Sequence, residues 1–174
     1  MATPGSRSTL APERGVAVCP GTYDPVTLGH LDIIERTAQV FERVVVAVVN
    51  QPPRKQQTLF SADDRCGFIA AEVEKLGNVQ VKAFDRLVVD FAREHSAKAI
   101  VKGLRAISDF EYEFEMNQLN RKMAPNIESI YLIASPRYSF LSSSGVKEVA
   151  MFGGDLSEFV PPAVADRLKE AAPR

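Results

Sequence analysis

The sequence is poor in the side chains that build disulfide frameworks and zinc sites. Its 174 residues include two cysteines, two histidines and no tryptophan. Cys19 and Cys66 lie 47 residues apart, which matches no metal-ligand spacing, and a chain of this length can bury a core without disulfide bonds. The pattern favours a reducing compartment, so we expect a cytoplasmic protein.

Long apolar runs and an excess of one charge are also missing. No stretch approaches the roughly 18 apolar residues of a membrane-spanning helix, so we expect no membrane insertion. Lysine and arginine together number 21 against 22 acidic residues, which gives a net charge of −1. This balance gives no electrostatic reason to expect a nucleic acid partner, although a local basic cluster could bind a small anion.

The opening stretch, MATPGSRSTLAPERG, lacks the apolar centre of a secretory signal peptide. Its serine, proline, glycine and arginine content predicts a disordered extension over residues 1–14. Residues 15–174 contain no internal repeat and no linker-like stretch. We therefore expect a single folded domain over residues 15–174.

Short β-branched runs alternate with helical patterns along the chain. The runs occupy residues 16–19, 44–49, 79–83, 99–101 and 130–133. Strands that alternate with helices predict an α/β, Rossmann-like doubly wound domain, with a five-stranded parallel sheet and helices on both faces. The runs are apolar at successive positions, which is typical of a parallel sheet buried on both faces.

Four helical faces follow from the apolar spacing between these runs. They comprise Leu31, Ile34, Ala38 and Phe41; Ile69, Val73 and Leu76; Val88, Phe91, Ala92 and His95; and Tyr112, Met116, Leu119 and Met123. The spacing predicts that all four faces pack into the core, with His95 at a helix end and without a catalytic role. Ser61 is a predicted N-cap, since Asp63 and Asp64 follow it in a favourable first turn.

Unusual residues come directly after the predicted strands, where ligands of open parallel sheets bind. PGTYDPVTLGH follows the first run, NQPPRKQQ the second, KGLRAISDFEYE the fourth and SPRYSFLSSSGVK the fifth. If the first and fourth strands are neighbours, these segments converge on one crevice.

The first of these segments combines special backbone residues with a single histidine. Gly21 allows the chain to turn and a ligand to approach the backbone, and Pro25 orients the loop. Gly29 leaves the helix start uncluttered, so His30 can project beside free backbone N–H groups. Such a terminus favours phosphate, to which an imidazole can donate a hydrogen bond. By itself, the pattern suits a structural turn with a capping histidine equally well.

Three segments together carry a resemblance to a known family. PGTYDP (20–25) with TLGH (27–30) resembles the nucleotidylyltransferase signature related to HxGH. KGLRAISDFEYE (102–113) and YSFLSSSGVKEVA (138–150) narrow the resemblance to the phosphopantetheine adenylyltransferase family. The resemblance implies reversible adenylyl transfer from ATP to 4′-phosphopantetheine, which gives dephospho-coenzyme A and pyrophosphate. It implies a direct in-line displacement without a covalent enzyme intermediate.

The resemblance also implies a set of site residues. The implied catalytic residues are His30, Lys55, Thr22 and Arg105. The implied ATP-binding residues are Thr22, Tyr23, His30, Gly103, Leu104, Arg105, Glu113, Tyr138, Ser139, Phe140, Leu141, Ser142, Ser143 and Ser144. The implied residues for phosphopantetheine are Thr22, Lys55, Val88, Lys102, Met116 and Asn120.

Two positions depart from the pattern of the family. Lys102 stands where relatives often carry arginine, and a lysine is a point charge without the two-pronged fork of a guanidinium. The loop over residues 50–60 looks longer than in many relatives and contains both Arg54 and Lys55. We assign the single lysine role of this loop to Lys55, and a slip of one residue would select Arg54 instead.

The resemblance further implies a homo-oligomer, commonly a hexamer, and feedback by coenzyme A. Mg²⁺ is expected to arrive with ATP, because no carboxylate cluster marks a metal cage made by the protein.

Other acceptors stay open, namely nicotinamide mononucleotide, or glycerol phosphate with CTP. So does a nucleotide-binding regulatory module without chemistry. A metal hydrolase built on His30 and Asp32 is discounted, because positions two apart point to different faces of a helix.

Overall fold

The computed structural model describes residues 14–51 and 57–171, and over these residues strands and helices alternate as the sequence predicts. The strands are β1 (Val16–Gly21), β2 (Arg43–Val49), β3 (Val79–Phe84), β4 (Ala97–Leu104) and β5 (Glu128–Ile133). They form one parallel sheet in the order β3-β2-β1-β4-β5. The first and fourth strands are therefore neighbours, and the predicted extension lies outside the described residues except for Arg14.

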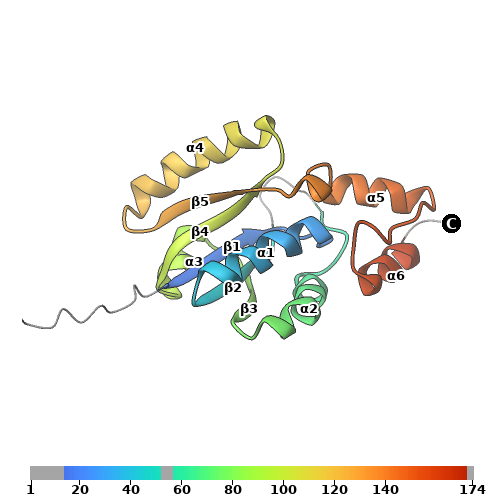
Figure 1. Cartoon of the computed structure of the whole chain (residues 1–174), viewed down its shortest axis with the longest axis horizontal. Helices are drawn as coiled ribbons and strands as arrows, with labels where there is room; N and C mark the ends of the chain where they lie inside the picture. Colours follow the sequence, from blue (N-terminus) through green and yellow to red (C-terminus); the bar gives the residue numbers. More distant parts are fainter. Residues whose placement is uncertain (1–13, 52–56, 172–174) are drawn as a thin grey trace, which may run out of the picture.

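Helices follow the strands on both sides of the sheet (Figure 1). They are α1 (Leu28–Val40), α2 (Ala62–Val73), α3 (Val88–Glu94), α4 (Ile107–Met123), α5 (Ser143–Met151) and α6 (Pro162–Ala171), with 3₁₀ turns η1 (Glu74–Leu76) and η2 (Pro136–Tyr138). Among the described residues, no helix has both the length and the apolar character that crossing a bilayer requires.

Two apolar clusters, one on each face of the sheet, form the core. On one face, α1, α2, α5 and α6 pack through residues such as Ile34, Ile69 and Leu168. On the other face, α3 packs Val89 and Phe91 against the opposite side chains of β1, β2 and β4. The central strands are buried on both faces because helices cover both, which confirms the predicted doubly wound architecture.

The edge strands differ from the prediction of strands buried on both faces. β3 alternates between partly buried and exposed residues, and β5 is only partly buried along its length. Each pairs with a neighbour on one side only, since β3 and β5 end the sheet. An apolar run in the sequence cannot distinguish a central strand from an edge strand, because both favour β-branched residues.

Three of the four predicted helical faces pack as expected, and the fourth does not. Leu119 and Met123 of α4 are 52% and 41% exposed, and Tyr112 is 37% exposed. α4 lies above β4 and β5, apart from the other helices (Figure 1). The core prediction for this face is wrong because helical spacing also suits the wall of a cavity, which is where these residues lie.

Side chains cap the helices that matter for the site. Thr27 caps α1 in a capping box with His30, and Ser142 caps α5 by accepting from the Gly145 amide at 3.0 Å. Ser61 accepts from the Asp64 amide at 3.0 Å, which confirms the predicted N-cap of α2. His95 is the C-cap of α3, as predicted, and its ring stacks on Phe91.

Candidate active site

A cavity of about 950 Å³ opens at the carboxyl ends of the strands, where open parallel sheets bind ligands. Its lining comes from segments that are far apart in the sequence: residues 19–23 at the end of β1 and after it, 84 and 86–88 at the end of β3 and after it, 101–103 and 105 in and after β4, and 141–144 at the start of α5. α4 closes another side. Three of the four segments therefore converge as the sequence predicts, whereas the segment after β2, residues 50–57, lies largely outside the described residues and its place stays a prediction.

His30 enters this cavity from the first turn of α1. Its Nδ1 accepts a hydrogen bond from the Thr27 backbone amide at 3.0 Å. Because that amide can only donate, the lone pair of Nδ1 is in use, and a neutral ring carries its hydrogen on Nε2. The cap therefore holds His30 as a donor through Nε2.

The loop before α1 is packed around Tyr23. This residue has a φ of 52°, its hydroxyl donates to the Cys19 carbonyl at 3.0 Å, and its ring meets His30 edge-on with centroids 5.1 Å apart. A Cβ on Gly21 would lie 2.8 Å from the Tyr23 ring. Close packing against this ring therefore explains the glycine at residue 21. Gly21 is the last residue of β1, and the turn expected there comes later, at Asp24 and Pro25.

Gly29 makes a similar close approach to the segment before α5. A Cβ at this position would lie 3.2 Å from the Cβ of Tyr138. The glycine therefore lets the start of α1 lie beside residues that line the cavity from the far end of the sequence.

Asp24 is a fully buried carboxylate behind the same loop. It accepts from the amides of Leu59 and Phe60 at 3.0 Å each, and Lys147 of α5 lies 3.0 Å away. Burial opposes ionisation of Asp24, but the two amides and the Lys147 ammonium outweigh it, so the pKa of Asp24 lies below its usual value. One carboxylate thus joins the β1 loop, the end of the loop over residues 50–60, and α5.

Arg65 of α2 is also fully buried, and its partners are main-chain oxygens. Its guanidinium donates to the carbonyls of Thr22, Val49, Asn50, Phe60 and Ser61 at 2.7–3.2 Å. The first of these carbonyls belongs to the loop after β1, and the next two belong to the end of β2. The side chain therefore ties together two of the segments that approach the cavity.

Cationic side chains reach the cavity from β4. Lys102 forms an ion pair of 2.5 Å with Glu113 of α4, and both side chains are about four-fifths buried. Arg105 donates to the Leu141 carbonyl at 2.8 Å, which links the end of β4 to the segment before α5. Glu113 is the one carboxylate among the described residues that line the cavity.

Neither a reactive thiolate nor a metal cage is built from the described residues. Cys19 lines the cavity, but burial raises the pKa of its thiol to about 12, so the sulfur stays protonated at neutral pH. No group of three or more histidine, cysteine, aspartate or glutamate side chains within residues 14–51 and 57–171 could hold a metal ion. Asp32 faces Arg36 and Ser135 rather than the cavity, which disfavours the metal hydrolase.

Comparisons with known proteins decide the family. Residues 18–149 match the family described as cytidylyltransferase-like. Phosphopantetheine adenylyltransferases of Heliobacterium modesticaldum and Caldanaerobacter subterraneus are 51% and 50% identical over 155 residues. These alignments cover 89% of this chain and 91% and 96% of those proteins.

The chain belongs to the phosphopantetheine adenylyltransferase family.

A solved structure supports the same fold. It comes from Vibrio parahaemolyticus and is described as a candidate nicotinate-nucleotide adenylyltransferase; the TM-score is 0.64 at 16% identity, over 89% of this chain and 91% of that chain. At this identity the likeness concerns the fold alone. The acceptor therefore has to be argued from the phosphopantetheine adenylyltransferase relatives and from the site.

Most of the residues that the resemblance implied line the one cavity. These are Thr22, Tyr23, His30, Val88, Lys102, Gly103, Arg105, Glu113, Met116, Asn120, Tyr138, Leu141, Ser142, Ser143 and Ser144. Leu104, Ser139 and Phe140 do not line it. Lys55 and the alternative Arg54 lie outside the described residues, so their assignment stays a prediction.

Sequence reasoning missed several residues that shape the site of this phosphopantetheine adenylyltransferase fold. Asp24 belongs to the motif PGTYDP, and its place among apolar neighbours could have been used to predict that the carboxylate is buried. Arg65 gave none, because an arginine in the first turns of a helix is ordinarily solvated. Leu87 lines the cavity and was not singled out, because an apolar side chain carries no chemical signature.

Proposed function

We propose that the chain transfers an adenylyl group from ATP to 4′-phosphopantetheine and releases pyrophosphate. The observation that carries this proposal is one cavity that unites His30, Lys102 and Arg105. Both substrates bring phosphate groups, which need cations and oriented N–H donors rather than a nucleophilic side chain. The named relatives, half identical over nearly their whole length, supply the acceptor.

The chemistry proposed for His30 follows from its cap. The nucleophile is a phosphate oxygen that is already ionised at neutral pH, so the reaction needs no general base. Charge accumulates on the α-phosphoryl group during the in-line attack. Because the Thr27 amide occupies Nδ1, we assign the Nε2–H of His30 as the ring donor to that charge.

The nucleotide is proposed to bind on the side formed by α1, Arg105 and α5. Ser142 caps α5, and the helix N-terminus presents backbone N–H groups that favour phosphate. Arg105, held on the Leu141 carbonyl, adds a positive charge near the same helix start. We assign the distal phosphates to this end of the cavity.

Phosphopantetheine is proposed to bind along the α4 side. Lys102 supplies the cation for its phosphate, and Met116 and Val88 offer an apolar path for its arm. Asn120, which is 6% exposed on the cavity side of α4, can pair with an amide of the arm. Lys102 is paired with Glu113, so binding of this phosphate would compete with the Glu113 carboxylate.

Magnesium is proposed to enter with ATP as part of the substrate. The described lining offers a single carboxylate, Glu113, and Lys102 already neutralises it. Because Mg²⁺ favours several oxygen ligands, this lining does not fit a cage made by the protein alone. No catalytic step is assigned to the ion.

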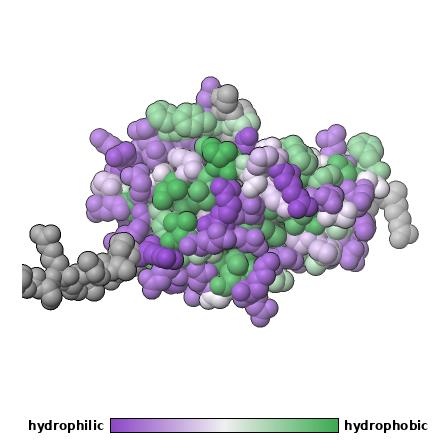
Figure 2. All heavy atoms as spheres, viewed as in Figure 1, coloured by the Kyte–Doolittle hydropathy of each residue, from purple (hydrophilic) through white to green (hydrophobic). Residues whose placement is uncertain are grey.

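We also propose a homo-oligomer in the cytoplasm, with the hexamer and coenzyme A feedback as the specific expectations. Phe110 and Phe114, which are about half exposed on α4, support association. Figure 2 shows hydrophobic residues at the top of the molecule, where α4 lies in the same view of Figure 1. Light scattering of the purified chain would test the assembly. Competition between coenzyme A and ATP would test the feedback.

The function is tested by incubating the purified chain with ATP, Mg²⁺ and one acceptor at a time. We expect pyrophosphate release with 4′-phosphopantetheine and none with nicotinamide mononucleotide. Glycerol phosphate with CTP serves as the third arm. Turnover with a different acceptor alone would replace the substrate assignment, and nucleotide binding without any pyrophosphate release would favour a regulatory module.

A further inference from the structure

Arg65 contacts the site only through the backbone. Its side chain is fully buried and is absent from the lining of the cavity, yet Thr22 and Val49, whose carbonyls it binds, both line that cavity. The bonds to these two carbonyls are the shortest that Arg65 makes, at 2.7 and 2.8 Å. The guanidinium therefore lies directly behind the wall of the cavity.

The planar guanidinium group of Arg65 fixes the directions of its hydrogen bonds as well as their lengths. Arg65 uses Nε and both terminal nitrogens, so its plane sets the directions in which five carbonyls point. A lysine ammonium has three donors on one atom and cannot span the ends of two strands. The neighbouring ends of β1 and β2 are thus held in a single geometry by one side chain.

The direction of the Thr22 carbonyl has a chemical consequence. In a planar trans peptide, the C=O of one residue and the N–H of the next point in opposite directions. The Thr22 carbonyl points at Arg65, so the Tyr23 N–H points away from Arg65. The Val49–Asn50 peptide at the end of β2 shows the same opposition. Its Val49 carbonyl accepts from Arg65, and its Asn50 N–H donates to the Phe84 carbonyl on the other side.

We propose that Arg65 is a positioning residue for adenylyl transfer, which orients the Thr22–Tyr23 peptide so that the Tyr23 amide donates to a phosphate oxygen during the reaction. This inference rests on the proposed function. Arg65 also binds the Asn50 carbonyl after β2 and the Phe60 carbonyl before α2. One buried cation therefore ties the loop after β1 to the end of β2 and the start of α2.

The unusual backbone of Tyr23 supports this assignment. A positive φ is a strained backbone conformation for a tyrosine and persists only where the surroundings enforce it. The bond from Arg65 to the Thr22 carbonyl, the edge-on contact of the Tyr23 ring with His30, and the space that Gly21 leaves for that ring supply this enforcement.

The test compares Arg65→Lys with a matched control, Arg167→Lys. Arg167 of α6 packs on the rings of Phe60 and Phe68 beside the same helix but is 45% exposed. We expect Arg65→Lys to lower kcat on the order of 10–100-fold, with KM for ATP within severalfold, at a temperature where thermal melting shows a folded protein. Arg167→Lys should leave both parameters within twofold.

The split between kcat and KM separates positioning from structural support. A folded Arg65→Lys with wild-type kcat would overturn the proposal, and so would one in which KM rises and kcat is unchanged. Both comparisons are made against wild-type turnover in the same assay. An inactive wild-type chain would therefore contradict the proposed function and not the role of Arg65.

A second measurement covers the case in which Arg65→Lys does not fold. Replacement of Tyr23 by its α-hydroxy acid exchanges the Tyr23 N–H for an ester oxygen and keeps the side chain. We expect a loss of kcat of about tenfold or more with a near wild-type melting temperature. An ester variant with unchanged kcat would show that the Tyr23 amide does not serve the reaction, and the proposal would fail.

Discussion

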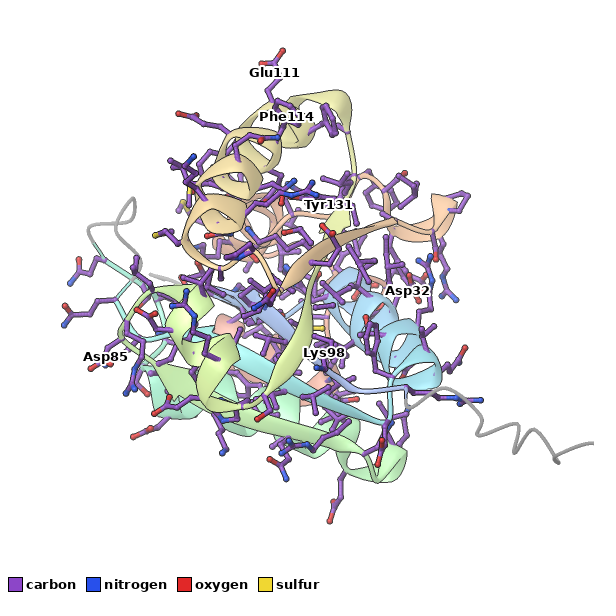
Figure 3. All side chains as sticks on the ribbon, turned by 90° about the vertical axis from the view of Figure 1, so that its left-hand side faces the viewer. Asp32, Asp85, Lys98, Glu111, Phe114 and Tyr131 are labelled. Atoms are coloured by element: carbon purple, nitrogen blue, oxygen red, sulfur yellow. The ribbon has the colours of Figure 1, made fainter. Side chains whose placement is uncertain are left out.

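The two sides of the cavity are built in different ways. The β1–α1 wall, residues 19–30, is backed by the sheet and held by the buried Asp24 and Arg65. The α4 wall, formed by the residues of α4 that line the cavity, belongs to a helix whose apolar side chains are largely exposed. In Figure 3, Glu111 and Phe114 extend from the outer side of α4, away from the sheet.

The polar contacts of the two walls differ as much as their burial. Around the first wall, charged groups bind backbone amides and carbonyls, which fixes the main chain itself. Among the described residues, the polar contacts that tie α4 to the sheet include the Lys102–Glu113 ion pair and the bond from the Tyr131 hydroxyl to the Glu113 carbonyl at 3.0 Å.

This difference matches the two tasks of the site. Groups that act on a developing charge must be held before the reaction, because their reorganisation would cost part of the stabilisation. A wall that binds a long flexible acceptor can instead adjust to it. We therefore expect substitutions in the β1–α1 wall to alter kcat or folding, and substitutions in the α4 wall to alter acceptor binding.

His30→Ala should have the largest effect. We expect kcat to fall on the order of 10²–10³-fold, the usual loss for one oriented donor, with ATP affinity within severalfold. Pyrophosphate release gives kcat, and calorimetry gives the affinity. His95→Ala, at the end of α3, is the matched control and should be fully active. A fully active His30→Ala would remove the imidazole from the mechanism.

Asp24→Asn should destabilise the β1–α1 wall. The variant loses a charged acceptor for two amides and leaves Lys147 without its carboxylate, so the free energy of unfolding should fall by about 2–3 kcal/mol at pH 7. Urea unfolding measures it. Asp90→Asn, which replaces an exposed carboxylate of α3, should change it by less than about 0.5 kcal/mol.

A comparison of the wild-type protein with Asp24→Asn at several pH values tests the pKa of Asp24. Its pKa is lowered in the folded state, so the stabilisation is complete above the pKa of an unfolded aspartate, about 3.9, and is lost as the pH falls through the lowered value. The difference between wild type and Asp24→Asn should stay constant from pH 8 to 5 and shrink below about pH 4. A difference that shrinks between pH 7 and 5 would contradict the assigned direction.

Glu113→Gln should tighten acceptor binding. The change removes the carboxylate that competes with a substrate phosphate for Lys102, so the Kd for 4′-phosphopantetheine without ATP should fall about three- to tenfold. Glu111→Gln, on the outer side of the same helix, should leave this Kd unchanged (Figure 3). Weaker binding by Glu113→Gln would show instead that the carboxylate holds Lys102 in its productive position.

Tyr131→Phe should give the smallest effect. It removes one hydrogen bond between β5 and α4 and should cost less than about 1 kcal/mol of global stability. Hydrogen exchange followed by mass spectrometry should show faster exchange in α4 and unchanged exchange in α1. An equal increase of hydrogen exchange in α1 and α4 would show that the two walls are not stabilised independently.

Much of the fold could be predicted because periodicity reports burial. The five strands and the faces of α1, α2 and α3 follow from apolar spacing, and only their boundaries shifted. The face of α4 was misassigned, since a cavity wall and a core use the same residues. The site could be located from the polar and glycine-containing segments that follow the strands. Arg65 could not be predicted, because its partners are backbone carbonyls, which every residue carries.

The sequence by itself determined the alternation of strands and helices, the family, and the segments that meet over the cavity, because side-chain periodicity and local motifs are properties of the chain. Only the tertiary structure decided which carboxylate faces Lys102 and which buried groups orient the loop. These depend on contacts between residues up to 123 positions apart, as between Asp24 and Lys147. No local pattern encodes such contacts, because folding alone brings their partners together.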